Sequence, residues 1–356
     1  MDSTILGGEA VGGRVVVTGA AGAVGRRLLS RLADALPESE VVAVDRRPAD
    51  GADAWGIVVV DLSADDLSEV LRGATAVVHL ATTTQPDVDD PDADERELVI
   101  VERVLAAAGT AEVAHVVVVS TAMVYGAWVG NPVPLTEDAP LRPNPDFAWA
   151  TVRAGVEQRA REWAEAADRS VAVLRPTAVV ADDALGQLAR VLHAARLGIA
   201  AEGDPPVQYL HVDDLAAALA LVVAVRFDGV ANVAPDGWIP PDQLGALEGP
   251  TARLRLPGWV VRLIAALRSR WGLSPIPPGI VPYTSHSWVV SNDRIRSLGW
   301  EPIHSNEEAW VVSHEPRTFD RLSARRRQEL ALAAVALLVT VIAGLLAALA
   351  ARFRRR

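Results

Sequence analysis

Three glycines near the amino terminus have a spacing that can bind a pyrophosphate. Gly19, Gly22 and Gly25 lie in the segment TGAAGAVG, which follows an apolar run and precedes a helical pattern within Arg14–Leu29. The first glycine allows a tight turn, the second lets backbone N–H groups approach a pyrophosphate, and the third lets the helix pack closely on the strand. The amino terminus of the helix then faces the phosphates. We expect the other dinucleotide contacts of this turn to come from Ala21, Ala23 and Val24.

An acidic residue follows at the distance that suits a bound ribose. The apolar run Val41–Val44 ends at Asp45, about twenty residues beyond Gly25. A carboxylate at this point can accept both hydroxyls of an adenosine ribose, which favours NAD over NADP. Arg46 or Arg47 could hold a 2′-phosphate, but Asp45 would repel that group. We therefore expect NAD as the cofactor, with Asp45 and Arg46 beside its adenosine ribose.

Further apolar runs alternate with helical patterns along the chain. This alternation predicts an α/β fold with a doubly wound parallel sheet, and it places the site at the carboxyl ends of the strands. There we expect Asp61 and Leu62 to meet adenine, and Leu80, Ala81 and Thr82 to lie beside the nicotinamide ribose, although simple turn chemistry explains the threonine equally well. The expected strands are Gly56–Val60, Ala76–Leu80, Val116–Val119, Val171–Leu174 and Val207–His211, and the expected helices are Glu95–Ala108, Ala148–Ala167, Ala184–Ala195 and Asp213–Val225.

The composition excludes several kinds of chemistry. The 356-residue chain has no cysteine, so disulfides, thiolate catalysis and zinc–sulfur sites are all absent. Its seven histidines are scattered without a paired ligand spacing, and we predict no metal site. A formal charge of −11 argues against a nucleic-acid-binding surface. All 34 basic residues are arginine, so no lysine is available for any role.

The carboxyl-terminal part of the sequence predicts a single membrane span. Leu330–Ala351 is a run of 22 residues interrupted only by Thr340 and Gly344, and arginines flank it on both sides. As a helix it would cover roughly 33 Å, enough for the hydrocarbon core of a bilayer. A buried helix would normally keep a polar stripe, which this run lacks. The amino terminus has no signal-peptide pattern, so we expect a cell-membrane protein whose globular part lies in the cytoplasm.

The segments around this span complete the predicted organisation. Small residues recur every four positions in the span and would let two such helices approach, so we expect a homodimer as one arrangement. A long proline-rich loop, Gly126–Phe147, is predicted to close over the site. The tryptophans that follow residue 235 are expected to pack a smaller lobe. The predicted boundaries are a flexible lead-in at 1–13, a globular domain at 14–315 with its small lobe mainly at 176–206 and 235–315, a linker at 316–329, the span at 330–351 and a basic tail at 352–356.

Seven short segments resemble the extended short-chain dehydrogenase/reductase family, in particular its NAD-dependent epimerase/dehydratase group. The likeness runs from about Arg14 to Glu315 and implies a Rossmann-type domain with a smaller substrate lobe. It also implies that the first four segments line NAD, that Thr121 hydrogen-bonds a substrate hydroxyl, and that His211 and Asp213 are structural. The segments are TGAAGAVG at Thr18–Gly25, VD at Val44–Asp45, DL at Asp61–Leu62, HLAT at His79–Thr82, STAMVYG at Ser120–Gly126, LRPT at Leu174–Thr177 and QYLHVDDLA at Gln208–Ala216.

The catalytic motif of that family is replaced in this chain. The family carries Tyr-x-x-x-Lys, in which the tyrosine exchanges a proton with the reacting oxygen and the lysine holds the nicotinamide ribose. The matching stretch here is WATVR, which gives Trp149 and Arg153. An indole N–H can donate a hydrogen bond but cannot act as a general base near neutral pH. Arg153 can still donate to the ribose hydroxyls, but it stays charged and does not replace a lysine.

Two further departures concern the substrate, and three functions remain open. The family's asparagine after the sixth strand is Ala178 here, and an arginine that would meet a diphosphate is Val207, although Arg253 or Arg255 could still bind phosphate. A nucleotide sugar therefore stays an open expectation. The first function is a membrane-anchored, NAD-binding sensor or scaffold without tyrosine-based catalysis. The second is an active epimerase, dehydratase or oxidoreductase, and the third is a structural membrane adaptor with an empty cleft. The second would need a relocated base, for which the candidates are Asp146, Tyr125 and a water molecule.

Overall fold

The computed structural model describes residues 13–48, 55–81, 93–181, 187–196, 198–249, 253–271 and 276–313. Several predictions lie outside these ranges: nearly all of the lead-in, the cofactor contact Thr82, the linker, the membrane span with its small-residue face, and the basic tail. Within the described ranges, no helix has the length and apolar character needed to cross a membrane.

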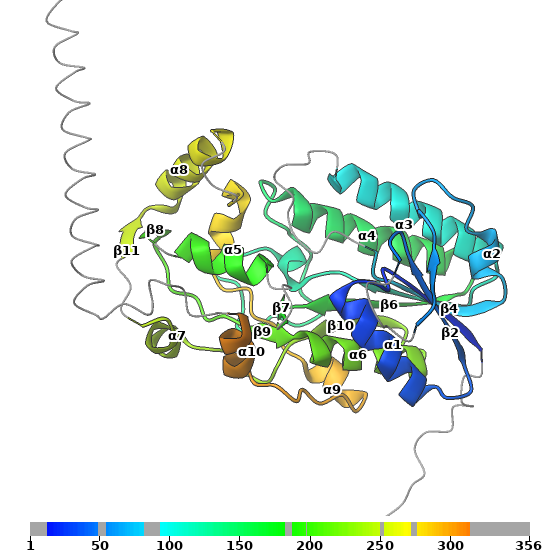
Figure 1. The fold of residues 1–356 in the computed structure, drawn as a ribbon. Helices are drawn as coiled ribbons and strands as arrows, with labels where there is room; N and C mark the ends of the chain where they lie inside the picture. Colours follow the sequence, from blue (N-terminus) through cyan, green and yellow to red (C-terminus); the bar gives the residue numbers. More distant parts are fainter. Residues whose placement is uncertain are drawn as a thin grey trace, which may run out of the picture.

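A seven-stranded parallel sheet forms the centre of the larger part (Figure 1). Its strand order is β10-β6-β5-β4-β1-β2-β3, and every neighbouring pair is parallel. Helices cover both faces, which explains why strands such as RVVVT and HVVVV are almost continuously apolar. The predicted α/β, Rossmann-type fold is therefore confirmed. The strands are β1 (Arg14–Thr18), β2 (Glu40–Asp45), β3 (Ile57–Val59), β4 (Ala74–His79), β5 (His115–Val119), β6 (Ser170–Pro176) and β10 (Gly229–Val233).

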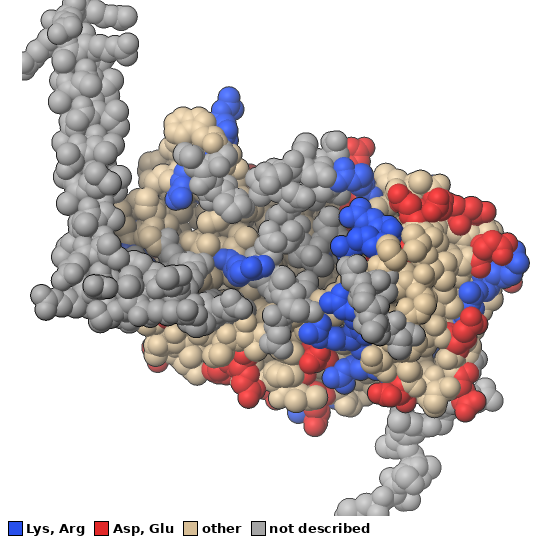
Figure 2. Space-filling model, viewed as in Figure 1, with Lys and Arg blue, Asp and Glu red and all other residues tan. Residues whose placement is uncertain are grey.

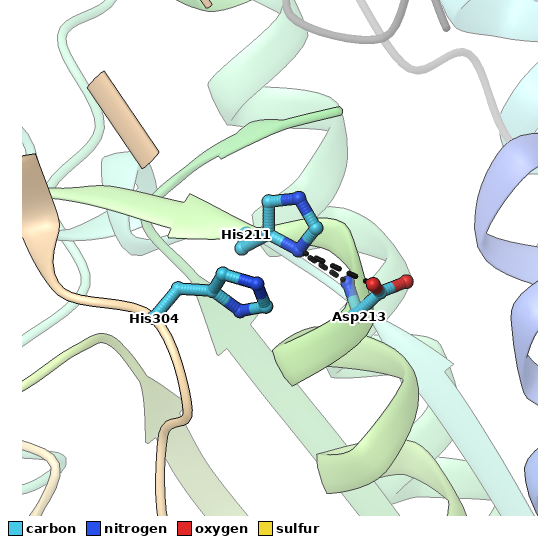
Figure 3. Close-up of side chains that lie close together, drawn as sticks. All are labelled: His211, Asp213 and His304. Carbon is cyan, nitrogen blue, oxygen red and sulfur yellow. Dashed lines mark hydrogen bonds and ion pairs between the residues drawn. The ribbon is translucent and has the colours of Figure 1, made fainter. Parts of the chain in front are cut away.

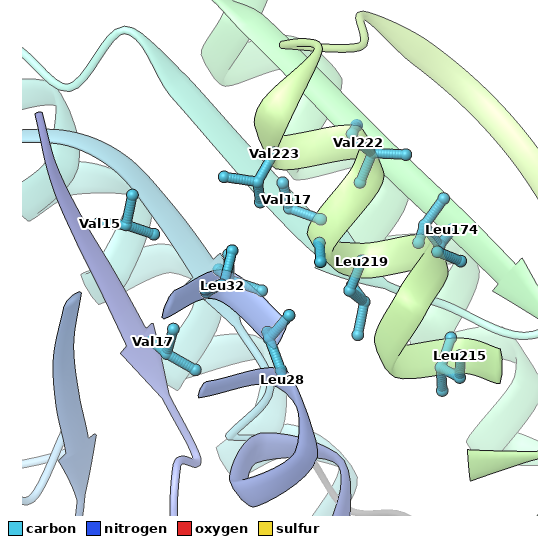
Figure 4. Packing of buried hydrophobic residues seen from close by; sticks show 14 of the residues in the cluster. Val15, Val17, Leu28, Leu32, Val117, Leu174, Leu215, Leu219, Val222 and Val223 are labelled. Carbon is cyan, nitrogen blue, oxygen red and sulfur yellow. The ribbon is translucent and has the colours of Figure 1, made fainter. Parts of the chain in front are cut away.

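Two helices pack on each face of this sheet. On one face α1 lies against α6, and Leu28 and Leu32 of α1 meet Val15 of β1 and Leu219 of α6 (Figure 4). On the other face α3 lies beside α4 over a second buried cluster that includes Val16. The two layers hold the carboxyl ends of the strands in fixed positions. The helices of this part are α1 (Ala23–Ala35), the short α2 (Ser68–Leu71), α3 (Ala93–Thr110), α4 (Ala148–Glu165) and α6 (Val212–Ala224).

The smaller lobe is built from short elements beyond the carboxyl ends of the strands (Figure 1). The two-stranded parallel sheet of β7 and β9 packs with helices around a core that contains Tyr209, Ile239, Ile280 and Trp288. A second two-stranded parallel sheet, β8 with β11, packs against α8 in a smaller cluster that includes Val261. Its elements are β7 (Ala178–Val180), α5 (Gln187–Arg196), β8 (Gly198–Ala201), β9 (Tyr209–His211), α7 (Pro241–Glu248), β11 (Arg253–Leu256), α8 (Gly258–Arg270), the 3-10 helix η2 (Pro278–Thr284) and α10 (Asn306–Ser313). The short α9 (Asp293–Ser297) packs on β10.

The structure corrects several details of the sequence prediction. Strand β10, which forms the edge of the main sheet, was missed because GVANV is short and contains a buried asparagine. Strand β9 begins at Tyr209 rather than at Val207. The prediction that the tryptophans are packing residues is correct for three of them and wrong for three others. Trp288, Trp300 and Trp310 are buried, whereas Trp238, Trp259 and Trp271 are 36%, 66% and 68% exposed.

Candidate functional site

The glycine turn joins β1 to α1 in a conformation that glycine alone allows without strain. Gly19 has φ +73°, and a Cβ there would lie 2.6 Å from the backbone N of Ala81 at the end of β4. At Gly25 a Cβ would lie 2.5 Å from the carbonyl oxygen of Gly19, so this glycine permits close packing of the helix on the turn. Gly22 is the N-cap of α1, where a Cβ would meet the Gly19 oxygen at 3.1 Å. The turn therefore has the geometry that the spacing predicts.

The start of α1 has the properties of an anion site. Its N-cap, Gly22, supplies no side-chain hydrogen bond, and its first turn holds no acidic residue. The first N–H groups of a helix have no partner within the helix, and they carry the positive end of the helix dipole. A phosphate placed over Ala23 and Val24 would satisfy these donors. The residues present thus fit a dinucleotide pyrophosphate.

Asp45 lies at the end of β2, directly against this turn. Its carboxylate accepts hydrogen bonds from Ala21 N at 3.0 Å and from Arg47 N at 3.1 Å, and it is 8% exposed. The Arg47 guanidinium is 3.9 Å away and largely exposed, and Arg46 is exposed as well. The acid is thus held next to the phosphate turn, as a ribose ligand must be.

The other expected cofactor contacts differ in character. Leu62 is buried in the core under α3, so its side chain is a packing residue rather than a surface for adenine. Asp61 is exposed, and hydrogen bonds from the hydroxyl and backbone of Ser63 lower the pKa of its carboxyl. Leu80 and Ala81 follow β4, where Leu80 N donates to Thr18 O across to β1. These two residues lie at the strand ends that face the glycine turn.

A buried histidine connects the same two strands. His79 Nδ1 is hydrogen-bonded to Thr18 Oγ1 at 2.9 Å, and the ring is 1% exposed. Burial, with a smaller contribution from the positive charge of Arg153, lowers the pKa of His79 to about 4. The ring is therefore neutral near neutral pH and serves as a polar link under the cleft.

The residues at the end of β5 offer two hydroxyls. Thr121 caps the 3-10 helix η1 (Ala122–Tyr125), and its Oγ1 accepts from Met123 N at 3.2 Å. Ser120 is 5% exposed, and its Oγ has no hydrogen-bond partner among the described residues. Sequence reasoning named only Thr121. The structure adds Ser120 as a buried hydroxyl that a ligand could satisfy.

Trp149 and Arg153 lie one turn apart on α4 and contact each other. The Arg153 guanidinium is 5.2 Å from the centre of the Trp149 ring, a cation–π contact, and Trp149 also packs on Phe147. Arg153 Nη1 lies 2.6 Å from Glu97 Oε1 on α3, and both side chains are 3% exposed or less. The same nitrogen donates to Val119 O at 3.4 Å. Arg153, which the sequence resemblance aligns with the family's lysine, is therefore a buried arginine whose charge Glu97 neutralises.

Comparison with known proteins identifies the family. The sequence model of the NAD dependent epimerase/dehydratase family matches residues 15–234. The chain belongs to this family. No curated protein matches the sequence.

Solved structures with the same fold include proteins that were crystallised with NAD, one of them together with a nucleotide sugar. MoeE5 in complex with UDP-glucuronic acid and NAD is 23% identical, with a TM-score of 0.63 over 84% of this chain and 97% of that one. A UDP-glucose 4-epimerase from Thermus thermophilus, complexed with NAD, is 20% identical, with a TM-score of 0.62 over 84% and 97%. DesIV, a dTDP-glucose 4,6-dehydratase from Streptomyces venezuelae, is 22% identical, with a TM-score of 0.61 over 84% and 95%. At these identities the likeness establishes the fold.

Both candidate side chains for a relocated base in this epimerase/dehydratase domain already have other partners. The Tyr125 hydroxyl donates to Asn232 Oδ1 at 2.8 Å and accepts from Arg175 Nη1 at 2.6 Å. Arg175 also makes a bidentate pair with Glu157, at 2.9 and 2.6 Å. All four side chains are buried, and burial raises the pKa of Tyr125 despite the nearby Arg175. Asp146 is 63% exposed and pairs with Arg262 of α8 at 3.2 Å.

The small lobe holds the arginines expected to meet a phosphate. Arg253 is paired with Glu248, and Arg255 Nη2 lies 2.6 Å from Asp204 Oδ2. The buried Arg196 joins them at 3.7 Å from Asp204 Oδ1, and burial lowers the pKa of its guanidinium. These pairs compensate most of the positive charge of the three arginines.

A surface hollow of about 260 Å³ lies between the long loop and the lobe, lined in part by Trp128, Asn131, Asp204 and His286.

A group of two histidines and an aspartate lies at the start of α6 (Figure 3). His211 caps the helix, because its Nδ1 accepts from Asp213 N at 3.2 Å. The His304 ring stacks on it at 3.9 Å with a 28° interplanar angle, and His304 Nδ1 lies 3.1 Å from Asp214 Oδ2. Asp213 is paired with Arg27 of α1 at 2.7 Å. One potential ligand atom from each of the three residues lies within 4.8 Å of the others, a spacing that could hold a metal ion, so the structural role of His211 and Asp213 and the absence of a metal site stay predictions.

Proposed function

We propose that this protein binds NAD, has lost the tyrosine-based proton transfer of its family, and acts from the membrane as a cofactor-bound sensor or scaffold. The observation that carries the proposal is the contrast between the two halves of the site. The glycine turn and Asp45 keep a geometry that suits a dinucleotide. Trp149 and the Arg153–Glu97 pair occupy the place of the proton-transfer groups.

The binding half is supported by the chain's own residues and by its relatives. A Cβ at Gly19 or Gly25 would collide with backbone, so the turn is kept open as a pyrophosphate cradle requires. Asp45 is fixed beside it by Ala21 N. Several solved relatives hold NAD. Bound NAD would supply hydride transfer, and this chain's residues would position it.

The chemical half lacks a group that can move a proton. The Trp149 indole cannot accept one near neutral pH, and Arg153 remains charged. Arg153 can contact the nicotinamide ribose only while it shares its guanidinium with Glu97. General acid–base assistance is typically worth ~10²–10⁴ in rate, so we propose that turnover on any alcohol or sugar is reduced by about this factor.

An active sugar-nucleotide enzyme is the second candidate. Its support is the pair of hydroxyls at Ser120 and Thr121, together with the solved relatives that hold UDP-glucuronic acid or UDP-glucose. Under this alternative the base would be a water molecule, because Tyr125 is already held by Arg175 and Asp146 by Arg262. A nucleotide sugar would then be the substrate class.

Membrane anchoring is part of the proposal and rests on the sequence. The apolar run of residues 330–351 and its arginine flanks would place the globular domain at the cytoplasmic face. Extraction of the membrane fraction tests it directly. A protein that carries the run but is recovered in the soluble fraction would contradict the anchor.

Cofactor binding and chemistry are tested separately. Calorimetric titration should give tighter binding of NAD than of NADP, and Asp45→Ala should weaken NAD while leaving NADP nearly unchanged. Robust turnover of the wild-type protein on an alcohol or a nucleotide sugar would overturn the loss of catalysis. A triple variant restores the family's tyrosine and lysine through Trp149→Tyr and Arg153→Lys. Its third change, Glu97→Gln, removes the carboxylate that would otherwise pair with the new lysine.

A further inference from the structure

Helix α8 has an apolar face that nothing in the described residues covers. Trp259, Leu263, Leu267 and Trp271 recur every four positions along this helix and its final cap, and they are 66%, 53%, 42% and 68% exposed. The opposite face packs through Val261, which is 7% exposed, onto the lobe. In Figure 1 the helix lies at the outer end of the small lobe. Helix α8 is therefore anchored on one side and open on the other.

This face holds more exposed apolar side chains than scattered surface residues would give. Single exposed apolar residues are common and need no explanation. Here four large ones share one helical face, and Leu254 on the preceding strand adds another at 57% exposed. Contiguous apolar patches of this kind mark a surface that meets a protein or a membrane.

The charges around the face point to an anionic lipid surface. The sequence of α8, GWVVRLIAALRSR, contains three arginines and no acidic residue, in a chain with a formal charge of −11. In Figure 2 the surface over α8, at the upper left, is tan and blue. Tryptophans at both ends, leucines between them and arginines beside them form the pattern of helices that lie in a membrane interface.

The chain beyond the described residues makes this contact sterically accessible. Sixteen residues, 314–329, separate the end of α10 from the apolar run at 330–351. An extended chain of that length spans up to ~55 Å, whereas a 300-residue domain has a radius of gyration of about 19 Å. The length of this segment alone would therefore allow α8 to face the bilayer.

We propose that α8 lies in the interfacial region of an anionic bilayer, with Trp259, Leu263, Leu267 and Trp271 toward the acyl chains and Arg268 and Arg270 at the lipid phosphates. The inference rests on the membrane anchor of the proposed function. The docked helix would then fix the orientation of the domain at the bilayer. The neighbouring pair of Arg262 and Asp146 would lie close to the membrane surface.

The absence of cysteine allows a clean test in the full-length protein. Leu263→Cys provides a single site for a nitroxide label, and Val129→Cys, at a position that is 85% exposed in the long loop, provides the control. Each protein is reconstituted into phosphatidylcholine vesicles with or without phosphatidylglycerol. With phosphatidylglycerol, the label at 263 should lose access to a water-soluble nickel relaxation agent and gain access to oxygen. The label at 129 should stay aqueous in both preparations.

Each outcome separates docking from its alternatives. Flotation with vesicles while the label at 263 stays aqueous overturns docking but keeps the anchor, and failure to float overturns both. Dipolar coupling between labels on two molecules would assign the face to a second copy. A label already shielded in detergent, without change in lipid, would assign it to residues 330–351 of the same chain. Adding Leu267→Glu should return the label at 263 to water, whereas Val311→Glu, at a position that is 58% exposed on α10, should not.

Discussion

Replacement of Tyr125 by phenylalanine distinguishes a structural residue from a relocated base. The phenol is 1% exposed and holds two buried partners, Arg175 at 2.6 Å and Asn232 at 2.8 Å. Tyr125→Phe leaves a guanidinium nitrogen and an amide oxygen buried without that partner. A buried polar group left without its partner costs about 1–3 kcal/mol, and more where it is charged, so the free energy of unfolding should fall by ~2–5 kcal/mol.

The assay is thermal unfolding, measured beside NAD titration. For a domain of this size each kcal/mol is worth roughly 2–4 °C, so the midpoint should drop by ~5–15 °C while NAD affinity changes little. Tyr283→Phe is the matched control, because that buried hydroxyl has only uncharged partners: it donates to the Met123 carbonyl at 2.8 Å and accepts from Asn144 N at 3.5 Å, so its loss should cost about 1 kcal/mol. An unchanged midpoint for Tyr125→Phe, with loss of any turnover, would refute the structural assignment.

Three further predictions concern buried charge, pH and the glycine turn. Arg153→Met leaves Glu97 buried without its partner and should cost ~3–5 kcal/mol in urea unfolding, whereas Arg153→Lys should cost less. Burial lowers the pKa of His115 to about 4 from 6.5, so the unfolded chain binds more protons between these values. Stability should therefore fall as the pH is lowered through this window, by up to ~1.4 kcal/mol per pH unit for His115 and as much again for His79, whose pKa is also lowered to about 4, and His115→Gln should remove only the His115 part of the slope. Gly25→Val, whose Cβ would lie 2.5 Å from a carbonyl oxygen, should weaken NAD binding and stability, while Gly245→Ala in open space on α7 should not.

The features that the sequence predicts well are local along the chain. The turn at Gly19–Gly25 could be recognised because each glycine meets backbone within the same turn or at the next strand end. Asp45 could be placed because its strand pairs directly with β1. The central strands β1, β4, β5 and β6 were recognisable because burial on both faces makes them almost continuously apolar.

The features that were missed depend on contacts between distant segments. Glu97 lies 56 residues before Arg153, and the hydrophobic pattern of α3 does not distinguish it from an exposed glutamate. The partner of Tyr125 at Asn232 comes from a strand that itself was not predicted. Trp259 and Trp271 were expected to be buried because tryptophan usually is, and only the placement of α8 at the edge of the lobe exposes them.

Trp149 and Arg153, which the sequence resemblance aligns with the family's tyrosine and lysine, form one coupled arrangement with Glu97 rather than two independent substitutions. Trp149, Arg153 and Glu97 satisfy one another: the guanidinium stacks on the indole and neutralises the carboxylate, and both charged groups are buried. A buried ion pair is strongly destabilised when one partner is removed, so no single substitution returns the site to the family's motif without a cost in stability. A tyrosine introduced alone at position 149 would face a guanidinium already committed to Glu97. The packing of α4 on α3 therefore holds Arg153 against Glu97, while the glycine turn is held by its own backbone contacts with the ends of β1 and β4.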